Sequence, residues 1–326
     1  MRLIGSKLAD LRTGSSLARA WQLHLEQYRV PSELIHEVNC PRCGSHHKKP
    51  VLEREGLRIV WCKDCGIGYT DRRWTDAGLR RYYQEGYFKG GVPGAYMDYQ
   101  QEEAEKKVDF LAKYAWIKSL RAEGRVLDVG CATGVSLIAA GETGFKPHGI
   151  EISEWAYENR CTNLPMKHCG LLEMETKKPF DIITMWDVIE HLADPAPSFK
   201  KLATLLKPGG LLVFTYPDAG TGWARVLGAR WGVLVPQEHY LFFASRQIRA
   251  WLREYGFHLV QERVERRIFT LRKFMQQALS TNPQGKFGDV QVSLSIPYKK
   301  IAVYKLKVLD KIRPDPKPSA FPTRRA

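Results

Sequence analysis

Four cysteines are the residues whose types and spacing most directly indicate chemistry. Cys40 and Cys43 form one C-x-x-C pair, Cys62 and Cys65 form a second, and 18 residues separate the two pairs. A glycine follows each pair and lets the backbone turn so that both sulfur atoms face one point. Four thiolates at this spacing are typical of a closed tetrahedral zinc site. Two disulfides or a redox C-x-x-C are the alternatives, which a reducing compartment disfavours. We therefore expect a structural zinc ion.

A second set of residues predicts a pocket for a nucleoside. Asp128 begins the segment D-V-G-C-A-T-G, which ends at Gly134, follows a predicted strand and opens a predicted helix. A glycine-rich turn at that place lets the backbone approach a ligand closely. The spacing G-x-A-x-G differs from the dinucleotide pattern G-x-G-x-x-G. Glu151 ends the next predicted strand, 17 residues after Gly134, where an acid can accept hydrogen bonds from two ribose hydroxyls.

One histidine is a candidate general base, because an imidazole titrates near neutral pH. His239 lies in P-Q-E-H-Y, after the fifth predicted strand and before a predicted helix, which places it over the carboxyl end of the sheet. We expect Glu238 to orient it and Tyr240 to act as a supporting donor. The alternative is a histidine that only holds a loop. His191 is the rival base, although it and Glu190 are better explained as capping and orienting the pocket wall.

The elements that must position these residues alternate between strand and helix. Alternation of this kind predicts an α/β fold, a doubly wound sheet with helices on both faces. We also expect 257–266 to form an antiparallel edge pair with 289–295. The segment 221–235 carries Trp223, Leu227 and Trp231 at helical spacing and is interpreted as a lid, with two arginines as possible phosphate contacts. The five predicted parallel strands lie at 125–130, 147–152, 165–169, 180–187 and 210–218.

Four motifs, taken in order, resemble those of class I S-adenosylmethionine-dependent methyltransferases over about residues 75–265. They are V-L-D-V-G-C-A-T-G, the acid Glu151, F-D-x-x-x-x-W-D-V-I-E-H-L and L-K-P-G-G-x-L-L-V-F. The four-cysteine segment, Y-Y-x-x-x-Y-F and E-H-Y-L-F-F-A-S further resemble a bacterial branch that includes methyltransferases of nucleotide-linked deoxysugars and polysaccharides. The resemblance implies a Rossmann-like seven-stranded sheet of order 3-2-1-4-5-7-6, preceded by a zinc ribbon.

The resemblance also implies a set of residues that bind S-adenosylmethionine. Leu171 departs from the family, because many members carry an acid there to bind the adenine amine, and Ala132 replaces a glycine. The implied contacts are, for the methionine part, Asp128, Gly130, Cys131, Ala132 and Gly134; for the ribose, Glu151 and Ile152; for the adenine, Gly170 and Leu171; near the sulfonium, Trp186 and Asp187; and closing from outside, Tyr83 and Tyr87.

The chain is strongly basic. Its 326 residues include 50 Lys and Arg and 35 Asp and Glu, a net charge of +15, and the segment from Val264 to Ala326 holds 14 of the former against four of the latter. Such an excess indicates either an anionic partner or a solubilising tail. With 44% apolar and 26% charged residues the composition is that of a globular protein. No apolar run is long enough for a membrane span and no signal peptide is visible, so a cytoplasmic location is expected.

These observations predict five segments: helices at 1–38, the zinc ribbon at 39–70, a helical cap or linker at 71–122, the methyltransferase domain at 123–296, and a basic, Pro-containing tail at 297–326 with a mobile end. The first functional hypothesis is a methyltransferase acting on a small anionic or carbohydrate acceptor, with peripheral membrane contact left open. The second is an RNA methyltransferase that grips phosphates with its ribbon and tail. Against this second hypothesis, the sequence has neither the D/N-P-P-Y/F loop of enzymes that methylate nucleobase amino groups nor the Pro-Cys dipeptide of cytosine C5 methyltransferases. The third is a non-catalytic scaffold that binds S-adenosylmethionine.

Overall fold

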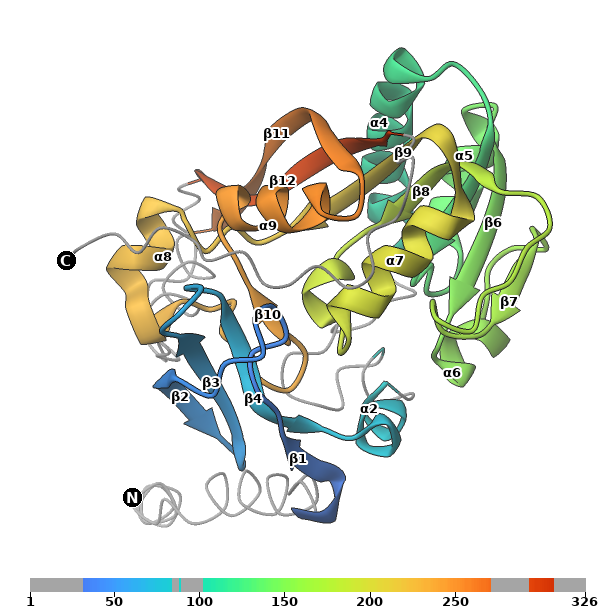
Figure 1. The fold of residues 1–326 in the computed structure, drawn as a ribbon. Helices are drawn as coiled ribbons and strands as arrows, with labels where there is room; N and C mark the ends of the chain where they lie inside the picture. The colour runs from blue at the N-terminus through green and yellow to red at the C-terminus, as the bar shows by residue number, and fades with distance from the viewer. Residues whose placement is uncertain (1–31, 84–87, 89–101, 271–292, 308–326) are drawn as a thin grey trace, which may run out of the picture.

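The computed structural model describes residues 32–83, 88, 102–270 and 293–307. These residues form two sheets, a seven-stranded one that carries the glycine-rich turn and a five-stranded one that carries the four cysteines. Helices cover the larger sheet, and the smaller sheet lies at one end of it (Figure 1). Tyr87 lies outside the described residues, as do 1–31 of the predicted N-terminal helices.

The seven-stranded sheet has the predicted strand order. From one edge to the other it runs β11-β12-β9-β8-β5-β6-β7. When the seven strands of this sheet are numbered in chain order from β5 and read from the β7 edge, the order is 3-2-1-4-5-7-6. The pairs among β5 to β9 are parallel, whereas β12 is antiparallel to both of its neighbours. The strands are β5 (Arg125–Val129), β6 (Lys146–Glu151), β7 (Met166–His168), β8 (Phe180–Met185), β9 (Leu206–Tyr216), β11 (Phe257–Thr270) and β12 (Ser293–Leu306).

Each face of this sheet is covered by its own helices. Side chains of a strand alternate between faces, so Leu212 and Phe214 pack with α7 and α9, whereas Leu211 and Val213 pack with α4 and α5. Pro195 begins α7, where its fixed φ suits the first helical position. The result is the doubly wound arrangement (Figure 1). The helices are α4 (Glu103–Leu120), α5 (Val135–Glu142), α6 (Glu154–Glu158), α7 (Pro195–Leu205) and α9 (Ser245–Arg253).

The five-stranded sheet is the ribbon, defined here as β1 to β4 with β10. Its order is β1-β4-β3-β2, and β10 also pairs with β4, with Leu241 opposite Tyr69. One hydrophobic cluster joins Cys40 and Val60 of the ribbon region to Ile248 and Trp251 of α9. The ribbon therefore shares a core with the larger sheet. Its strands are β1 (Ile35–Glu37), β2 (Lys48–Arg54), β3 (Leu57–Cys62), β4 (Gly68–Trp74) and β10 (Leu241–Phe242).

The predicted partner of 257–266 was wrong. Phe257 pairs with Leu306 and Arg266 with Pro297, so 257–266 pairs with 297–306, and residues 297–306 lie in an inner strand rather than in a tail. Ile301 and Val303 face one layer of helices and Ala302 the other. A strand buried on both faces shows no alternation of polar and apolar residues, and the flanking lysines concealed it. The part of the predicted tail beyond Lys307 lies outside the described residues.

Other boundaries also shift. The segment 35–37 is strand rather than helix because it pairs with β4, and β4 continues the ribbon past residue 70 to Trp74. The short helix expected near 75–88 is present as α2 (Asp76–Tyr82), capped by Thr75.

In the predicted lid, α8 (Gly222–Leu227) ends before Gly228, so Trp231 does not continue the helical face of Trp223 and Leu227. Three 3-10 turns complete the described elements, η1 (Ser32–Leu34), η2 (Ile189–His191) and η3 (Gly228–Arg230). Within the described ranges no helix has the length and apolarity to cross a membrane.

Candidate functional site

The glycine-rich turn between β5 and α5 is tight. Gly130 and Gly134 have φ of +71° and +93°, and a Cβ on either would lie 2.8 Å and 2.6 Å, respectively, from a neighbouring side-chain carbon. Ala132 also has a positive φ of 48°, which is uncommon for a residue with a side chain. Its N–H donates to Glu151 Oε2 at 2.8 Å, and this bond holds the turn in place.

Two buried carboxyl groups face this turn from the strand ends. Glu151 also accepts the Ser153 N–H at 2.8 Å, and burial raises its pKa against these backbone donors. Thr184 donates to Asp128 Oδ1 at 2.6 Å, whereas Asp128 Oδ2 is buried without a hydrogen-bond partner among the described residues. Burial raises the pKa of Asp128 to about 7. Acceptors of this kind fit the hydroxyl and ammonium donors of S-adenosylmethionine.

Asp187, at the end of β8, is held in a strained conformation. Its φ is +56°, in the left-handed region. Thr215 accepts its N–H at 2.7 Å and donates to its Oδ1 at 2.6 Å, and Lys299 Nζ lies 2.6 Å from its Oδ2. Burial opposes ionisation of Asp187, but Lys299 and Lys113 outweigh it and lower its pKa below the usual range. Strain that is fixed by several contacts is common at functional sites.

The neighbouring Trp186 side chain packs into the core. Its indole N–H donates to Ser136 Oγ at 3.1 Å, and the ring packs against Phe110 and Tyr114 in the core beneath α4. The backbone of Trp186 and the side chain of Asp187 are what β8 presents at its carboxyl end.

His239 and His191 lie together, with ring centroids 4.8 Å apart. His239 Nδ1 is 2.7 Å from the Val233 carbonyl, and His191 Nδ1 is 2.9 Å from the Tyr83 hydroxyl. The Tyr240 N–H donates to the Glu190 carbonyl at 2.7 Å and joins the two histidine segments. Burial lowers the pKa of His239 to about 4 and that of His191 well below its usual value, so both rings are neutral at neutral pH.

The structure corrects the predicted partners of His239. Glu238 does not contact it: the buried Glu238 carboxylate accepts from the Tyr82 hydroxyl of α2 at 2.9 Å. The Tyr240 ring is 1% exposed and packs with Tyr82 and ribbon residues, and its hydroxyl has no hydrogen-bond partner in the described part of the chain. The ribbon and α2 thus hold both side chains away from His239, and the Val233 carbonyl orients the imidazole instead.

Sequence reasoning missed Lys299. It was assigned to the basic tail, but β12 pairs with β9 so that Lys300 lies opposite Tyr216. This register brings Lys299 to the carboxyl end of the parallel strands, beside Asp187. Two consecutive lysines before an apolar run were the available signal. Because consecutive side chains of a strand point to opposite faces, Lys299 and Lys300 have different partners. Lys300 pairs with Asp218 at 2.8 Å and with Glu262 at 3.0 Å.

The remaining implied cofactor residues lie along the same edge. Gly170 donates its N–H to Glu173 Oε2 at 3.0 Å, and Leu171 is buried in the core. The Ile152 carbonyl lies 3.1 Å from His168 Nε2. Cys131 is buried. The Tyr83 hydroxyl contacts His191.

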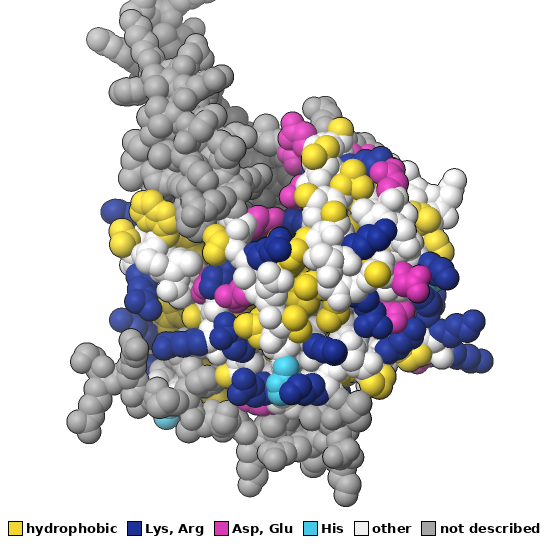
Figure 2. All heavy atoms as spheres, turned by 90° about the horizontal axis from the view of Figure 1, so that it is seen from above, with side chains coloured by type: hydrophobic (Ala, Val, Ile, Leu, Met, Phe, Trp, Pro, Cys, Tyr) yellow, Lys and Arg dark blue, Asp and Glu magenta, His cyan; other side chains and the backbone are white. Residues whose placement is uncertain are grey.

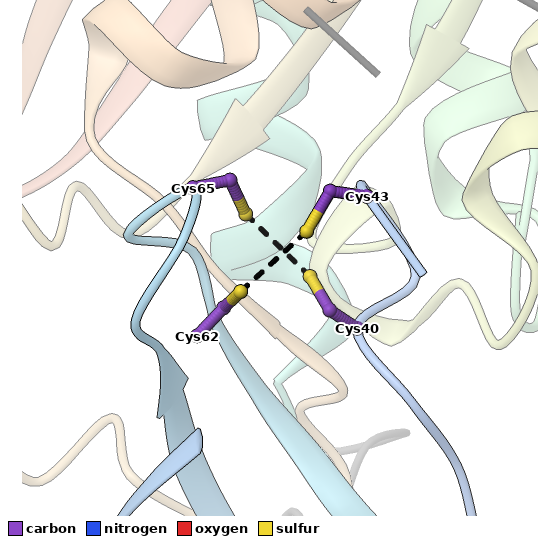
Figure 3. Close-up of side chains that lie close together, drawn as sticks. All are labelled: Cys40, Cys43, Cys62 and Cys65. Atoms are coloured by element: carbon purple, nitrogen blue, oxygen red, sulfur yellow. Dashed lines mark hydrogen bonds between the residues drawn. The ribbon is translucent and has the colours of Figure 1, made fainter. Parts of the chain in front are cut away.

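The four cysteines converge on one point. Cys40 Sγ is 3.5 Å from Cys65 Sγ, Cys43 Sγ is 3.5 Å from Cys62 Sγ, and all four sulfur atoms lie within 4.8 Å of one another (Figure 3). A disulfide would need about 2.05 Å. A tetrahedron with Zn–S bonds of about 2.3 Å has edges of about 3.8 Å. The arrangement therefore fits a zinc ion, and four protein ligands leave no open position on it.

The ribbon is joined directly to the His239 segment. The Thr70 hydroxyl donates to the His239 carbonyl at 2.7 Å, and the Thr70 N–H donates to the Tyr240 carbonyl at 3.1 Å. The Trp74 indole donates to the Gln237 carbonyl at 3.0 Å. With β10 paired to β4, the residues on both sides of His239 are fixed by the ribbon.

Comparison with known proteins identifies the family to which this chain is similar. A family model described as a methyltransferase domain matches residues 96–262. The ubiquinone biosynthesis O-methyltransferase of Albidiferax ferrireducens is 31% identical over 112 residues, which are 31% of this chain and 44% of that protein. Its counterpart from Ralstonia nicotianae is 30% identical over 131 residues, 36% of this chain and 54% of that protein. The chain thus spans about half the length of these two relatives.

Two solved structures are similar at lower identity. The 1,6-didemethyltoxoflavin-N1-methyltransferase of Burkholderia thailandensis, with S-adenosylhomocysteine bound, is 15% identical with a TM-score of 0.47, covering 80% of this chain and all of that one. The magnesium protoporphyrin IX methyltransferase of Synechocystis is 18% identical with a TM-score of 0.42, covering 70% and 93%.

The family match spans more than half of the chain. It includes the glycine-rich turn, Glu151, Asp187 and His239, and the sheet has the strand order that the motifs predicted. The chain belongs to the methyltransferase domain family and has the class I fold of S-adenosylmethionine-dependent methyltransferases.

Proposed function

We propose that the protein transfers the methyl group of S-adenosylmethionine to a hydroxyl of a small-molecule acceptor in the cytoplasm. One observation carries this proposal. The strained Asp187 at the end of β8 is paired with Lys299, and the charges of both act on the neutral His191–His239 pair. Val188, the residue after Asp187, lies against Gly130 of the glycine-rich turn. A cofactor pocket and a proton-accepting site thus adjoin at the carboxyl edge of the sheet, where ligands of such folds bind.

The residues of the turn would hold the cofactor. Asp128 Oδ2 is a free acceptor for its ammonium group, Glu151 has further lone pairs for the ribose hydroxyls, and the two glycines let the backbone approach. S-adenosylmethionine supplies an electrophilic methyl group on a sulfonium. The protein's task is then to align the acceptor in line with that methyl group and to exclude water.

His239 is the proposed proton acceptor. A carbonyl oxygen can only accept a hydrogen bond, so the Val233 carbonyl requires the proton of a neutral His239 to be on Nδ1. Nε2 is then the basic nitrogen. As the acceptor oxygen attacks the methyl carbon, Nε2 takes the hydroxyl proton, the S–CH3 bond breaks, and S-adenosylhomocysteine leaves. The low pKa of His239 keeps Nε2 unprotonated at neutral pH but makes it a weaker base than a free imidazole.

The acceptor class proposed is anionic or carbohydrate-like, such as a nucleotide-linked sugar or a polysaccharide precursor. Arg225 and Arg230 are exposed at the α8 turn and can meet phosphates. The relatives named as O-methyltransferases support oxygen as the methylated atom.

A small molecule is favoured over RNA by the placement of the basic residues. Lys299 and Lys300, which the sequence assigned to a tail, form ion pairs with acids of the larger sheet and its connections. On the face seen in Figure 2, Lys and Arg side chains are spread among acidic and apolar side chains rather than gathered in one block. A nucleic-acid grip needs a continuous basic surface.

The test uses S-adenosylmethionine with a radiolabelled methyl group. The purified full-length protein is incubated with extract from its own source, which is then split into small-molecule, nucleic-acid and lipid or polysaccharide pools. Label in the small-molecule or polysaccharide pool supports the proposal, and nuclease-sensitive label overturns it. His239→Ala should then lower kcat by roughly 100- to 10,000-fold while the Kd for S-adenosylhomocysteine stays within about twofold. His258→Ala, on β11, is the matched control.

A further inference from the structure

Glu190, His191 and His239 form a second cluster of metal-binding side chains, separate from the four cysteines. One ligand atom from each of the three residues lies within 4.8 Å of the other two. An ion bound at about 2.1 Å from each ligand requires separations of no more than about 4.2 Å. The widest pair therefore needs to close by well under 1 Å. Both histidines are only half-buried, so solvent reaches the cluster.

The hydrogen bond of His239 is typical of a metal ligand. A histidine that binds a metal usually gives its other ring nitrogen to a carbonyl, a carboxylate or another fixed polar group. His239 Nδ1 is 2.7 Å from the Val233 carbonyl, and His191 Nδ1 is 2.9 Å from the Tyr83 hydroxyl. The Val233 contact leaves Nε2 of His239 as its ligand atom. His191 is also hydrogen-bonded to the Glu238 backbone and would exchange one of its two contacts for the ion.

Glu190 supplies the strongest independent observation. Its side chain is 1% exposed, yet neither carboxylate oxygen has a hydrogen-bond partner anywhere in the described ranges. A buried carboxyl group without a partner is costly, and an ion in this cluster would remove that cost. Lys299, whose charge acts on Glu190, is already paired with Asp187 at 2.6 Å.

From these contacts we infer that Glu190, His191 and His239 bind a divalent transition-metal ion. Two imidazoles and one carboxylate suit Fe²⁺, Zn²⁺, Co²⁺ or Ni²⁺ better than the harder Mg²⁺. Three protein ligands leave coordination positions open, and an acceptor oxygen bound there would have its pKa lowered. This consequence rests on the proposed function and applies to the metal-loaded protein, in which the hydroxyl proton passes to solvent, because a metal-bound Nε2 of His239 is no longer a base. The binding of the ion itself does not depend on the proposed function.

The test is a titration of the zinc-loaded full-length protein with Co²⁺, without S-adenosylmethionine or acceptor. The zinc retained by the protein is measured by elemental mass spectrometry. The wild type should bind one further Co²⁺ per chain, with weak d–d absorption and no thiolate-to-cobalt charge-transfer band. Glu190→Gln and His191→Ala should each weaken binding at least roughly tenfold, as should Tyr83→Phe through His191. His258→Ala should bind as the wild type does.

Two outcomes overturn the inference. One is that Co²⁺ binds only with loss of zinc and with a charge-transfer band, which places it at the cysteines. The other is that Glu190→Gln and His191→Ala bind Co²⁺ as tightly as the wild type. Thermal melting identifies any variant that fails to fold. If His191→Ala does not fold, the Co²⁺ affinity of Glu190→Gln, which keeps the size of the side chain, decides between the outcomes. Methyl transfer is assayed separately, so cobalt binding without any methyl acceptor would refute the proposed function and leave this site standing.

Discussion

At the residue scale, the site is built from groups whose environment opposes their ordinary charge. Burial raises the pKa of Asp128 to about 7 and that of Glu190 to about 8. Burial lowers the pKa of His239 to about 4. Two buried carboxyl groups and a neutral imidazole make the site ready to receive cationic or hydrogen-bonding ligands. Such perturbed groups concentrate at functional sites.

Asp128 should make the stability of the free protein depend on pH. Its pKa is about 7 in the folded chain against 3.8 for the unperturbed group. Between these values the folded chain keeps a proton that the unfolded chain releases. This contribution is complete below about pH 4 and is lost as pH rises through 7, at up to about 1.4 kcal/mol per pH unit.

The variant Asp128→Asn removes this titration. Urea unfolding at pH 5 and pH 8 should therefore show a smaller fall in the free energy of unfolding for Asp128→Asn than for the wild type. Equal falls for the two proteins would mean that Asp128 titrates normally in the folded state.

At the element scale, β12 completes the site. It enters the sheet between β9 and β11 and brings Lys299 to the carboxyl ends of the parallel strands. The ion pair holds Asp187, whose positive φ costs of order 1 kcal/mol or more without support. The strand therefore contributes a charged group that the five parallel strands alone do not provide.

Lys299→Met tests this role of β12. Loss of the ammonium should lower kcat at least roughly tenfold, since Asp187 loses its ion-pair partner, while stability falls by only about 1 kcal/mol. The matched control is Lys305→Met, at an exposed position of the same strand. Steady-state kinetics and denaturant unfolding separate the two effects. A variant with unchanged kcat would show that Lys299 serves packing alone.

The pairing of β4 with the His239 segment is a second positioning device. Thr70→Val removes the hydrogen bond to the His239 carbonyl at the cost of about 1 kcal/mol of stability. We expect kcat to fall with little change in KM for S-adenosylmethionine. Thr70→Ser keeps the hydroxyl and should restore kcat. If Thr70→Val and Thr70→Ser have equal kcat, the hydroxyl does not position His239.

At the scale of the whole molecule, the ribbon and the methyltransferase sheet share one hydrophobic core. Arg42 pairs with Glu254 and lies over the Trp251 ring of α9 at 5.4 Å. The Gln247 amide donates to the Cys65 carbonyl at 3.4 Å. Together with the shared core, these contacts transmit a change at the cysteines to the helices beyond them.

We propose that the four cysteines hold a zinc ion, and its removal should then affect stability and activity together. Chelation, or Cys62→Ser, should lower Tm in a single transition, because metal binding is coupled to folding of the ribbon and the ribbon shares its core with α9. Methyl transfer should be lost in parallel. Cys161→Ser, at an exposed cysteine outside the cluster, should leave Tm unchanged. Two separate melting transitions would show that ribbon and sheet fold independently.

The sequence alone determined what depends on local spacing. The two C-x-x-C pairs, the glycine turn of β5 and the alternation of strands and helices are each encoded in a few neighbouring residues. The order of the motifs was enough to predict the sheet order, because parallel strands joined by helices allow few topologies.

Only the tertiary structure decided which residues meet. Lys299 and Asp187 are 112 positions apart, and a strand buried on both faces has no periodicity to reveal it. Glu238 and Tyr240 flank His239 in the chain, yet the ribbon and α2 bind both of them, while Val233 and His191 contact the imidazole. Neighbours in sequence need not share a partner, because side-chain direction is set by packing across the whole fold rather than by spacing along the chain.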